Sequence, residues 1–271
     1  FGFIELNDGS YFTNLQVVFE ETKLDNYKEI AGQNCGASFN IVGTLELTPE
    51  AKQKCRHYLR STLAYQASWM DQYRSIEGYT DCDKWHSTNI DAKGKVMVGL
   101  PTTGAYHIER IRKEMMNGGY KSMPDSLVKV NLQYLVHMIP DHHCPVHVRW
   151  SKEHHPQYFY NLKNKGKKLG SHSFWDGSVA RWRKGWTAEK YFEQMEKLSK
   201  SQIKKVQKGD GYKWTQQTAN VSRYCHTLTP AGTDIAKLSK EERAEIHRVV
   251  DRQIQRAAYR LAGVLNEIFK E

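Results

Sequence analysis

The sequence predicts a mainly α-helical protein that is preceded by a short β-rich segment. The composition changes near residue 53. Residues 1–53 have a net charge of −5 and contain no tryptophan or histidine, whereas the remainder holds 37 basic and 22 acidic side chains, all seven tryptophans and all twelve histidines. Beyond the change, long segments repeat apolar residues every three or four positions, which is the helical period. We therefore expect two parts, residues 1–53 and residues 54–271, of which the second is large enough to bury a substantial core.

The first part alternates β-forming residues with turn residues. FIELND and NLQVVFEE flank Gly9 and Ser10, so we expect two strands that are joined by a tight turn. A short helical stretch, DNYKEIAGQN, follows, and SFNIVGTLELT is expected to form a third strand. Three strands are too few to close a barrel, so this part is predicted to be an incomplete β-domain.

The second part contains three segments with helical signatures. Residues 50–76 contain no glycine and follow Pro49, so we expect one long helix that begins there. Residues 126–139 and residues 241–269 are predicted to be amphipathic helices, the latter closing the chain. The apolar face of the first is Val128, Leu132, Leu135, Val136 and Ile139. The apolar face of the second is Ile246, Val250, Ile254, Ala257, Leu261, Leu265 and Ile268. Residues 151–170 are basic and are expected to form a loop without strands.

Charge and cysteine usage bound the function. The basic second part suits a polyanionic partner such as nucleic acid, although a merely soluble basic surface would have the same composition. No run of 18 apolar residues predicts a membrane span, and FGFIELNDGS lacks the features of a secretory signal. The five cysteines form no C-x-x-C pair, which argues against a thiolate zinc cluster, and their odd number leaves at least one thiol unpaired.

Histidines and aspartates gather in the stretch HMIPDHHCPVH, residues 137–147. His137 and Asp141 are four positions apart and share one helical face, and His147 follows a proline-containing turn that can direct it to another ion. His172 and Asp176, in GSHSFWDGS, repeat the four-residue spacing. Imidazole and carboxylate are ligands that zinc accepts, so the two pairs together predict a zinc centre.

Further candidate ligands and non-ligands lie around these pairs. Upstream, SWMDQYR offers Asp71 on a helix and CDKWHSTN offers His86. Four other histidines lack a carboxylate at helical spacing, and we expect them to be solvated or to face substrate: His142, His143, His154 and His155.

The second part resembles a known family. SWMDQYR, KWHSTNI, the pattern from His137 through Asp141 to His147, and SHSFWD are similar, in this order, to the zinc-site motifs of the single-strand nucleases of fungi, plants and bacteria, the S1/P1 nuclease family. LTPEAKQKCRHYL and RQIQRAAYRLAGVLNEIF resemble the family's early and final helices, so the likeness covers about residues 46–271. It implies an α-helical bundle shared with zinc phospholipases C. It also implies zinc-dependent hydrolysis of single-stranded DNA and RNA to 5′-phosphorylated products.

The resemblance also implies roles for individual residues. One zinc ion would be held by Asp71, His86, His137 and Asp141, and a second by His147, His172 and Asp176. The implied catalytic residues are Asp71, Arg74 and Asp141, with Arg74 stabilising charge in the transition state; the alternative is that Arg74 is an ordinary surface arginine. Ser87 and Asn89 stand where family members bind the nucleobase, although the residue types differ.

A third zinc ion in this family is held by an N-terminal tryptophan and a nearby histidine, and by the aspartate that matches Asp141. Residues 1–53 contain neither residue type. We therefore expect two zinc sites and an incomplete third. If the attacking water is normally shared with the third ion, hydrolysis should be slowed on the order of 10²-fold or more, by analogy with the loss of one electrostatic contributor in other enzymes.

Residues 1–53 resemble the OB anticodon-binding domain of asparaginyl-tRNA synthetases through FIELNDGS, NLQVVFEE, GASFNIVGTL and LTPEAKQ. Three hypotheses follow: a single-strand nuclease, a phosphodiesterase on other phosphoesters such as phospholipids, or a non-catalytic hybrid that binds metal and carries an OB-type nucleic-acid-binding segment. The nuclease family implies a secreted or periplasmic protein. Residues 1–53 instead resemble part of a cytoplasmic protein, so we expect that they are a fusion to the nuclease-like part.

Overall fold

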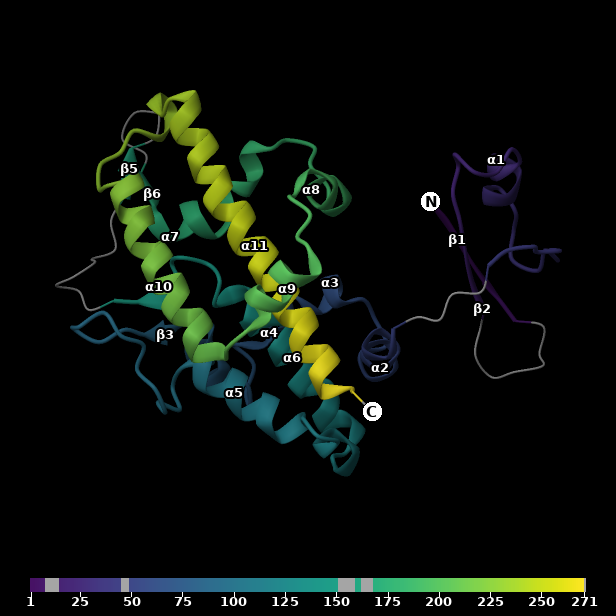
Figure 1. The fold of residues 1–271 in the computed structure, drawn as a ribbon, viewed down its shortest axis with the longest axis horizontal. Helices are drawn as coiled ribbons and strands as arrows, with labels where there is room; N and C mark the ends of the chain where they lie inside the picture. Colours follow the sequence, from purple (N-terminus) through teal and green to yellow (C-terminus); the bar gives the residue numbers. More distant parts are fainter. Residues whose placement is uncertain (8–14, 45–48, 151–158, 162–167, 271) are drawn as a thin grey trace. The chain divides into compact units, whose positions relative to one another are not determined.

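The computed structural model describes residues 1–7, 15–44, 49–150, 159–161 and 168–270, and it divides the chain into two units, Phe1–Leu47 and Thr48–Glu271 (Figure 1). The α-helices are α1 (Tyr27–Ala31), α2 (Glu50–Leu59), α3 (Leu63–Gln66), α4 (Trp69–Tyr73), α5 (Gly104–Met115), α6 (Asp125–Asp141), α7 (Ser171–Ser173), α8 (Ala188–Gln194), α9 (Lys200–Gln207), α10 (Gly211–Leu228) and α11 (Lys240–Ile268). The strands are β1 (Gly2–Leu6), β2 (Leu15–Phe19), β3 (Thr88–Asn89), β4 (Val148–Arg149), β5 (Phe159–Asn161) and β6 (Lys168–Gly170). Tighter or wider turns of helix are η1 (Thr80–His86), η2 (Gly119–Ser122), η3 (Phe174–Ser178), η4 (Ala180–Trp182) and η5 (Ile235–Lys237). The mainly α-helical class is confirmed.

The N-terminal unit is a β-hairpin with one short helix. β1 pairs with β2 antiparallel, with Gly2 opposite Phe19. The Phe19 ring lies over Gly2, where a Cβ would come within 2.2 Å of it, and it contacts Tyr27 of α1 at a centroid distance of 5.2 Å. The predicted two strands and short helix are confirmed, and the predicted turn lies outside the described residues.

The predicted third strand of this unit is wrong over residues 38–44, which form no strand, and residues 45–48 lie outside the described part. Val42, expected inside this strand, is 97% exposed. A strand needs a neighbour for its backbone groups, and among the described residues only β1 and β2 pair in this unit.

The long helix predicted for residues 50–76 is wrong, because the segment forms three short helices. α2 ends at Arg60, which takes a left-handed conformation with φ of 52°. The side chain of Thr62 then caps α3 by accepting a hydrogen bond from the Tyr65 amide. Each break turns the chain, so that α2, α3 and α4 all contact α6. α2 spans residue 53, where the composition changes.

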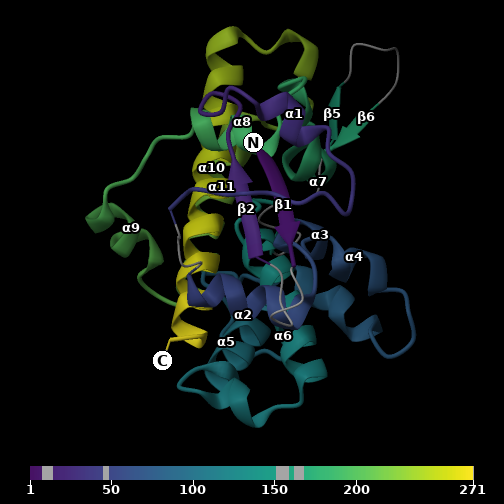
Figure 2. The ribbon, with the colours of Figure 1, turned by 90° about the vertical axis from the view of Figure 1, so that its right-hand side faces the viewer.

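The core of the helical unit forms around α6, which contacts α2, α5 and α11. All five residues of its predicted apolar face are buried, which confirms the prediction. Figures 1 and 2 show α11 as the longest helix of this unit, with α6 beside it. Because α6 is covered on several sides, the polar residues at its C-terminal end are enclosed by other elements.

The predicted closing helix is confirmed as α11, which begins at Ser239 with a capping box to Glu242. Its buried face differs from the predicted one, however. Ile254 is 41% exposed, whereas Gln253 and Arg260 are 5% and 2% exposed. The buried face of α11 includes Gln253 and Arg260 because their side chains form hydrogen bonds with groups inside the unit.

Two pairs of short strands were not predicted. β3 pairs with β4 in parallel, with Thr88 opposite Val148, and β5 pairs with β6 antiparallel. The expectation that residues 151–170 form a strandless loop is therefore wrong at residues 159–161 and 168–170, and the rest of that segment lies outside the described part. Among the helices that the structure describes, none combines the length and apolarity needed to span a bilayer.

Candidate metal centre

The C-terminal end of α6 and the turn after it present the stretch that the sequence singled out. His137 and Asp141 lie one helical turn apart on α6. After Asp141 the chain turns, with the Cys144 amide donating to the Asp141 carbonyl at 2.9 Å and the His147 amide donating to the Cys144 carbonyl at 3.1 Å. The His147 carbonyl then accepts from the Thr88 amide at 3.1 Å. The β3–β4 pair thus fixes His147 relative to the residues before β3.

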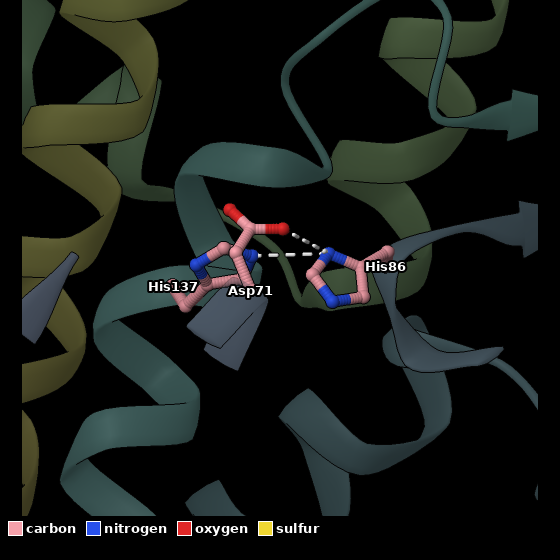
Figure 3. A group of neighbouring side chains, drawn as sticks. All are labelled: Asp71, His86 and His137. Atoms are coloured by element: carbon pink, nitrogen blue, oxygen red, sulfur yellow. Dashed lines mark hydrogen bonds and ion pairs between the residues drawn. The ribbon is translucent and has the colours of Figure 1, made fainter. Parts of the chain in front are cut away.

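Asp71 and His86 join His137 in a first group of donor atoms, all of which lie within 4.8 Å of one another. Asp71 is on α4 and His86 ends η1. The His86 Nδ1 atom is 3.1 Å from His137 Nε2 and 3.9 Å from Asp71 Oδ1 (Figure 3). Three elements that are distant in sequence therefore bring two imidazoles and a carboxylate together.

Asp141 adds a second carboxylate to this group. Its Oδ2 atom is 3.0 Å from His86 Nδ1, 3.4 Å from His137 Nε2 and 2.9 Å from His147 Nδ1. Burial alone would raise the pKa of the Asp141 carboxyl, but hydrogen bonds with the three imidazoles outweigh it and hold this pKa well below its ordinary value. These contacts therefore favour the ionised form of Asp141.

Asp141 raises the pKa values of two of these imidazoles, those of His137 and His147. Burial lowers the pKa of His137 and of His147, but the hydrogen bond to Asp141 and its charge outweigh burial, so both pKa values are raised. In the protein without metal, protons thus occupy positions that a cation could take. Metal binding at these nitrogens would release protons.

The donor set fits a zinc ion. The Ala67 carbonyl lies 2.5 Å from His137 Nδ1 and accepts its proton, which turns the Nε2 lone pair towards the other ligands, as is usual for metal-binding histidines. Zinc with bonds of about 2.0–2.1 Å holds ligand atoms about 3.3 Å apart in a tetrahedron. The observed separations of 3.0 to 3.9 Å bracket this value. The Nε2 atom of His86 is buried and has no hydrogen-bond partner among the described residues.

A second group of donor atoms consists of Cys144, His147 and Asp176, again within 4.8 Å of one another. Asp176 lies in η3, a wide helical turn, and its Oδ1 atom is 3.5 Å from His147 Nε2. The His172 ring stacks beside His147 at a centroid distance of 5.2 Å and an interplanar angle of 22°. Burial lowers the pKa of His172. The structure thus brings the three predicted second-site residues together and adds Cys144.

Sequence reasoning missed Cys144. Its Sγ atom is 3.5 Å from Asp176 Oδ1, and burial, together with the charge of Asp176, raises the pKa of this thiol well above its ordinary value. A signal was present, because Cys144 stands three positions before His147 and the two can face one ion across a turn. We overlooked it because the sequence was searched only for C-x-x-C pairs, and a single cysteine beside a histidine does not fit that pattern.

The predicted catalytic arginine lies at the edge of the first group. Arg74 Nη1 is 3.9 Å from Asp71 Oδ1 and 3.5 Å from Asp83 Oδ1, and the side chain is about half exposed. Ser87 is buried, and its hydroxyl has no hydrogen-bond partner among the described residues. Asn89 lies in β3 opposite Arg149 of β4. Ser87 and Asn89 therefore flank Thr88, whose amide bonds to the His147 carbonyl.

The expectation that His142 and His143 are solvated or face substrate is wrong, because each is 2% exposed. His142 Nδ1 donates to the Met138 carbonyl at 2.8 Å, and its Nε2 lies 2.9 Å from Thr88 Oγ1. Burial lowers the pKa of His142 to about 4. Their neighbours in the core are helix carbonyls and polar side chains, which a pattern of carboxylate spacing does not reveal. His154 and His155 lie outside the described residues.

Comparisons with known proteins give two matches. One match joins 53 residues, or 20% of this chain, to asparagine–tRNA ligases. The identity is 55% to the ligase of Clostridium perfringens (strain 13 / Type A), 58% to that of Clostridium botulinum (strain Eklund 17B / Type B) and 60% to that of Acetivibrio thermocellus. The chain spans only 11% of the length of these ligases.

The remainder of the chain matches a different protein class. A sequence model of the S1/P1 nuclease family matches residues 40–270, which include every donor residue of the two groups described above. The match covers well over half of the chain. The chain therefore belongs to the S1/P1 nuclease family.

Proposed function

We propose that the helical unit is a zinc-dependent phosphodiesterase that cleaves single-stranded DNA and RNA and leaves 5′-phosphates. The observation that carries this proposal is the position of Asp141, whose one oxygen lies within 3.4 Å of nitrogens from three histidines on separate segments. A bound cation would be shared by these nitrogens and the carboxylate in place of the protons that otherwise lie between them.

Two groups of residues would hold zinc. Asp71, His86, His137 and Asp141 would form one site, and His147, His172 and Asp176 would contribute to the other. When bound, the zinc ions would lower the pKa of a coordinated water and neutralise charge that develops on the phosphate. Because the ligands in each group come from several elements, metal binding would also tie these elements together.

The chain's own side chains prepare the site for a phosphodiester. Asp141 stays ionised because of its depressed pKa, and it orients the imidazoles that surround it. Arg74, half exposed beside Asp71, is placed to meet a negatively charged phosphate from the solvent side. The excess of basic residues beyond residue 53 raises the local concentration of a polyanionic substrate.

The third zinc site of the family bears on the rate. Residues 1–53 contain no tryptophan and no histidine, which are the residue types that the third ion requires. We therefore infer that this chain binds two zinc ions and hydrolyses nucleic acid more slowly than a family member with three. The same observation favours a second candidate function, a metal-binding body that does not hydrolyse.

One experiment separates these functions. The purified chain is dialysed against zinc, its zinc content is measured by mass spectrometry, and denatured DNA, duplex DNA, RNA and phospholipids are offered as substrates. Cleavage of single strands with 5′-phosphate ends supports the nuclease, and Asp71→Ala should abolish it whereas His57→Ala, on the exposed side of α2, should not. Two zinc ions without cleavage would support the non-catalytic body. Cleavage of phospholipids alone would overturn the nuclease proposal.

A further inference from the structure

We infer that Cys144 is a thiolate ligand of the second zinc ion, in a site that it shares with His147 and Asp176 and that His172 completes. This inference rests on the proposed zinc dependence, but not on hydrolysis. It assigns a soft sulfur ligand to a site for which the sequence predicted only nitrogen and oxygen ligands.

The distances fit an ion with mixed ligands. Cys144 Sγ and His147 Nε2 are each 3.5 Å from Asp176 Oδ1. With Zn–S bonds of about 2.3 Å and Zn–N and Zn–O bonds of about 2.0–2.1 Å, tetrahedral geometry separates sulfur from oxygen by about 3.6 Å and nitrogen from oxygen by about 3.3 Å. Both observed separations are therefore close to those that one shared ion would impose.

The backbone delivers the two side chains to the same place. Cys144 and His147 are the ends of a turn closed by the hydrogen bond from the His147 amide to the Cys144 carbonyl. The β3–β4 pair holds the His147 end, through the bond from the Thr88 amide. Asp176 enters from η3, on which the carbonyl of Trp175 also lies 3.9 Å from the Cys144 sulfur. Two oxygen atoms, the Trp175 carbonyl and Asp176 Oδ1, thus lie near the Cys144 sulfur, but its thiol has only one proton to donate.

Charge balance favours a thiolate here. With neutral imidazoles, His147, His172 and Asp176 give the site one negative charge, which leaves a bound Zn²⁺ with an excess charge in a partly buried pocket. A Cys144 thiolate makes the complex neutral, and its proton leaves for solvent when the metal binds. Sulfur also selects zinc over magnesium or calcium, which prefer oxygen.

His172 lies beside this site but outside the group of donor atoms that are all within 4.8 Å of one another, so its side chain would move towards the ion when the metal binds. Two imidazoles bound to one tetrahedral zinc, with Zn–N of about 2.0–2.1 Å, have ring centroids about 5 Å apart, and the His147 and His172 centroids are 5.2 Å apart. His172 is exposed, whereas Cys144 is only partly exposed. Four ligands, namely one sulfur, two nitrogens and one oxygen, would complete a tetrahedral shell. The coordinated water of the proposed hydrolysis would then belong to the first ion.

Cobalt substitution tests this inference, because a thiolate bound to Co²⁺ gives a near-ultraviolet charge-transfer band that nitrogen and oxygen ligands do not give. The full-length chain is freed of metal, titrated with Co²⁺ and compared with Cys144→Ser and Cys144→Ala. The control is Cys35→Ser, since Cys35 is an exposed free thiol of the N-terminal unit. Circular dichroism of each metal-free variant verifies folding.

We expect the wild type and Cys35→Ser to show the band, and both Cys144 variants to lose it and to bind the second ion at least about 10-fold more weakly. Cobalt binding without the band in the wild type, a band that persists in Cys144→Ser, or no second ion at all would each overturn the inference. A band without cleavage of any nucleic acid would leave it standing and would instead contradict the proposed hydrolysis. Cleavage of nucleic acid with two ions bound and no band would support the proposed hydrolysis and overturn the Cys144 inference.

Discussion

His143 should make the stability of the helical unit depend on pH. Its Nδ1 donates to the Ile139 carbonyl at 2.6 Å, and its Nε2 is 2.7 Å from a nitrogen of Arg260. Arginine has only donors, so His143 Nε2 must accept, and the imidazole must be neutral. A proton on Nε2 would face the Arg260 guanidinium in a site that is 2% exposed. Burial accordingly lowers the pKa of His143 to about 3.

The size and sign of the effect follow from linkage. The unfolded chain binds a proton at His143 with an ordinary pKa of about 6.5, whereas the folded chain does so only near pH 3. The stabilisation is therefore fully present above about pH 6.5 and is lost as the pH falls towards 3. At pH 5 the loss is about 2 kcal/mol, from about 1.5 pH units at about 1.4 kcal/mol each. This figure holds for any folded pKa well below 5.

Urea unfolding at pH 8, 7, 6 and 5 measures this loss, with wild type and His143→Gln kept in the same metal state. Glutamine can still donate to Ile139 and accept from Arg260 but does not titrate. We expect the free energy of unfolding of the wild type to fall by about 2 kcal/mol more than that of His143→Gln between pH 8 and pH 5. His57→Gln, at an exposed position on α2, should behave as the wild type. Equal losses in wild type and His143→Gln would refute the assignment of a buried neutral imidazole.

Three further changes have defined outcomes. His137→Ala should abolish the first zinc site and hydrolysis together, and zinc retained at the wild-type content would contradict the site. Arg74→Ala should lower kcat on the order of 10²-fold while the zinc content stays the same, by analogy with other transition-state contacts; an unchanged kcat would make it an ordinary surface arginine. Leu132→Ala, at a fully buried position of α6, should lower the free energy of unfolding by about 2–5 kcal/mol, and calorimetry would show a smaller effect if the core collapses onto the gap.

The sequence predicted those parts of the fold that depend on local periodicity. α6 and α11 repeat apolar residues at the helical period, so their positions could be inferred directly. The break at Arg60 could not, because a left-handed arginine has no sequence signature. The two-residue strands β3 and β4 exist only because distant segments meet, and no local pattern encodes them.

The candidate site divides in the same way. The helical spacing of His137 and Asp141 placed them on one face without further information. His86, by contrast, was only a candidate ligand from its own segment, and its assignment to the first ion came from resemblance to the family. The rejected histidines, His142 and His143, are buried with polar partners from other elements. Thr88 Oγ1 of β3 lies 2.9 Å from His142 Nε2, and the Gln253 side-chain amide of α11 donates to the His143 carbonyl at 2.7 Å. Tertiary hydrogen bonds of this kind override a pattern that assigns polar residues to the surface.

Asp141 links the two donor groups through the ring of His147. An ion bound at His147 Nε2 would fix the ring's proton on Nδ1, which lies 2.9 Å from Asp141 Oδ2, so the charge of Asp141 would stabilise that proton and help to orient the ring. Asp141 would thus be a ligand of the first ion and the orienting partner of the second.

Asp141→Ala should therefore remove the first ion and also weaken the second by about 10- to 100-fold, whereas His172→Ala should affect the second alone. Titration with zinc, followed by calorimetry, measures both affinities. If Asp141→Ala left the second affinity unchanged, the two groups would be independent, and the contact between Asp141 and His147 would serve only to hold the turn in place.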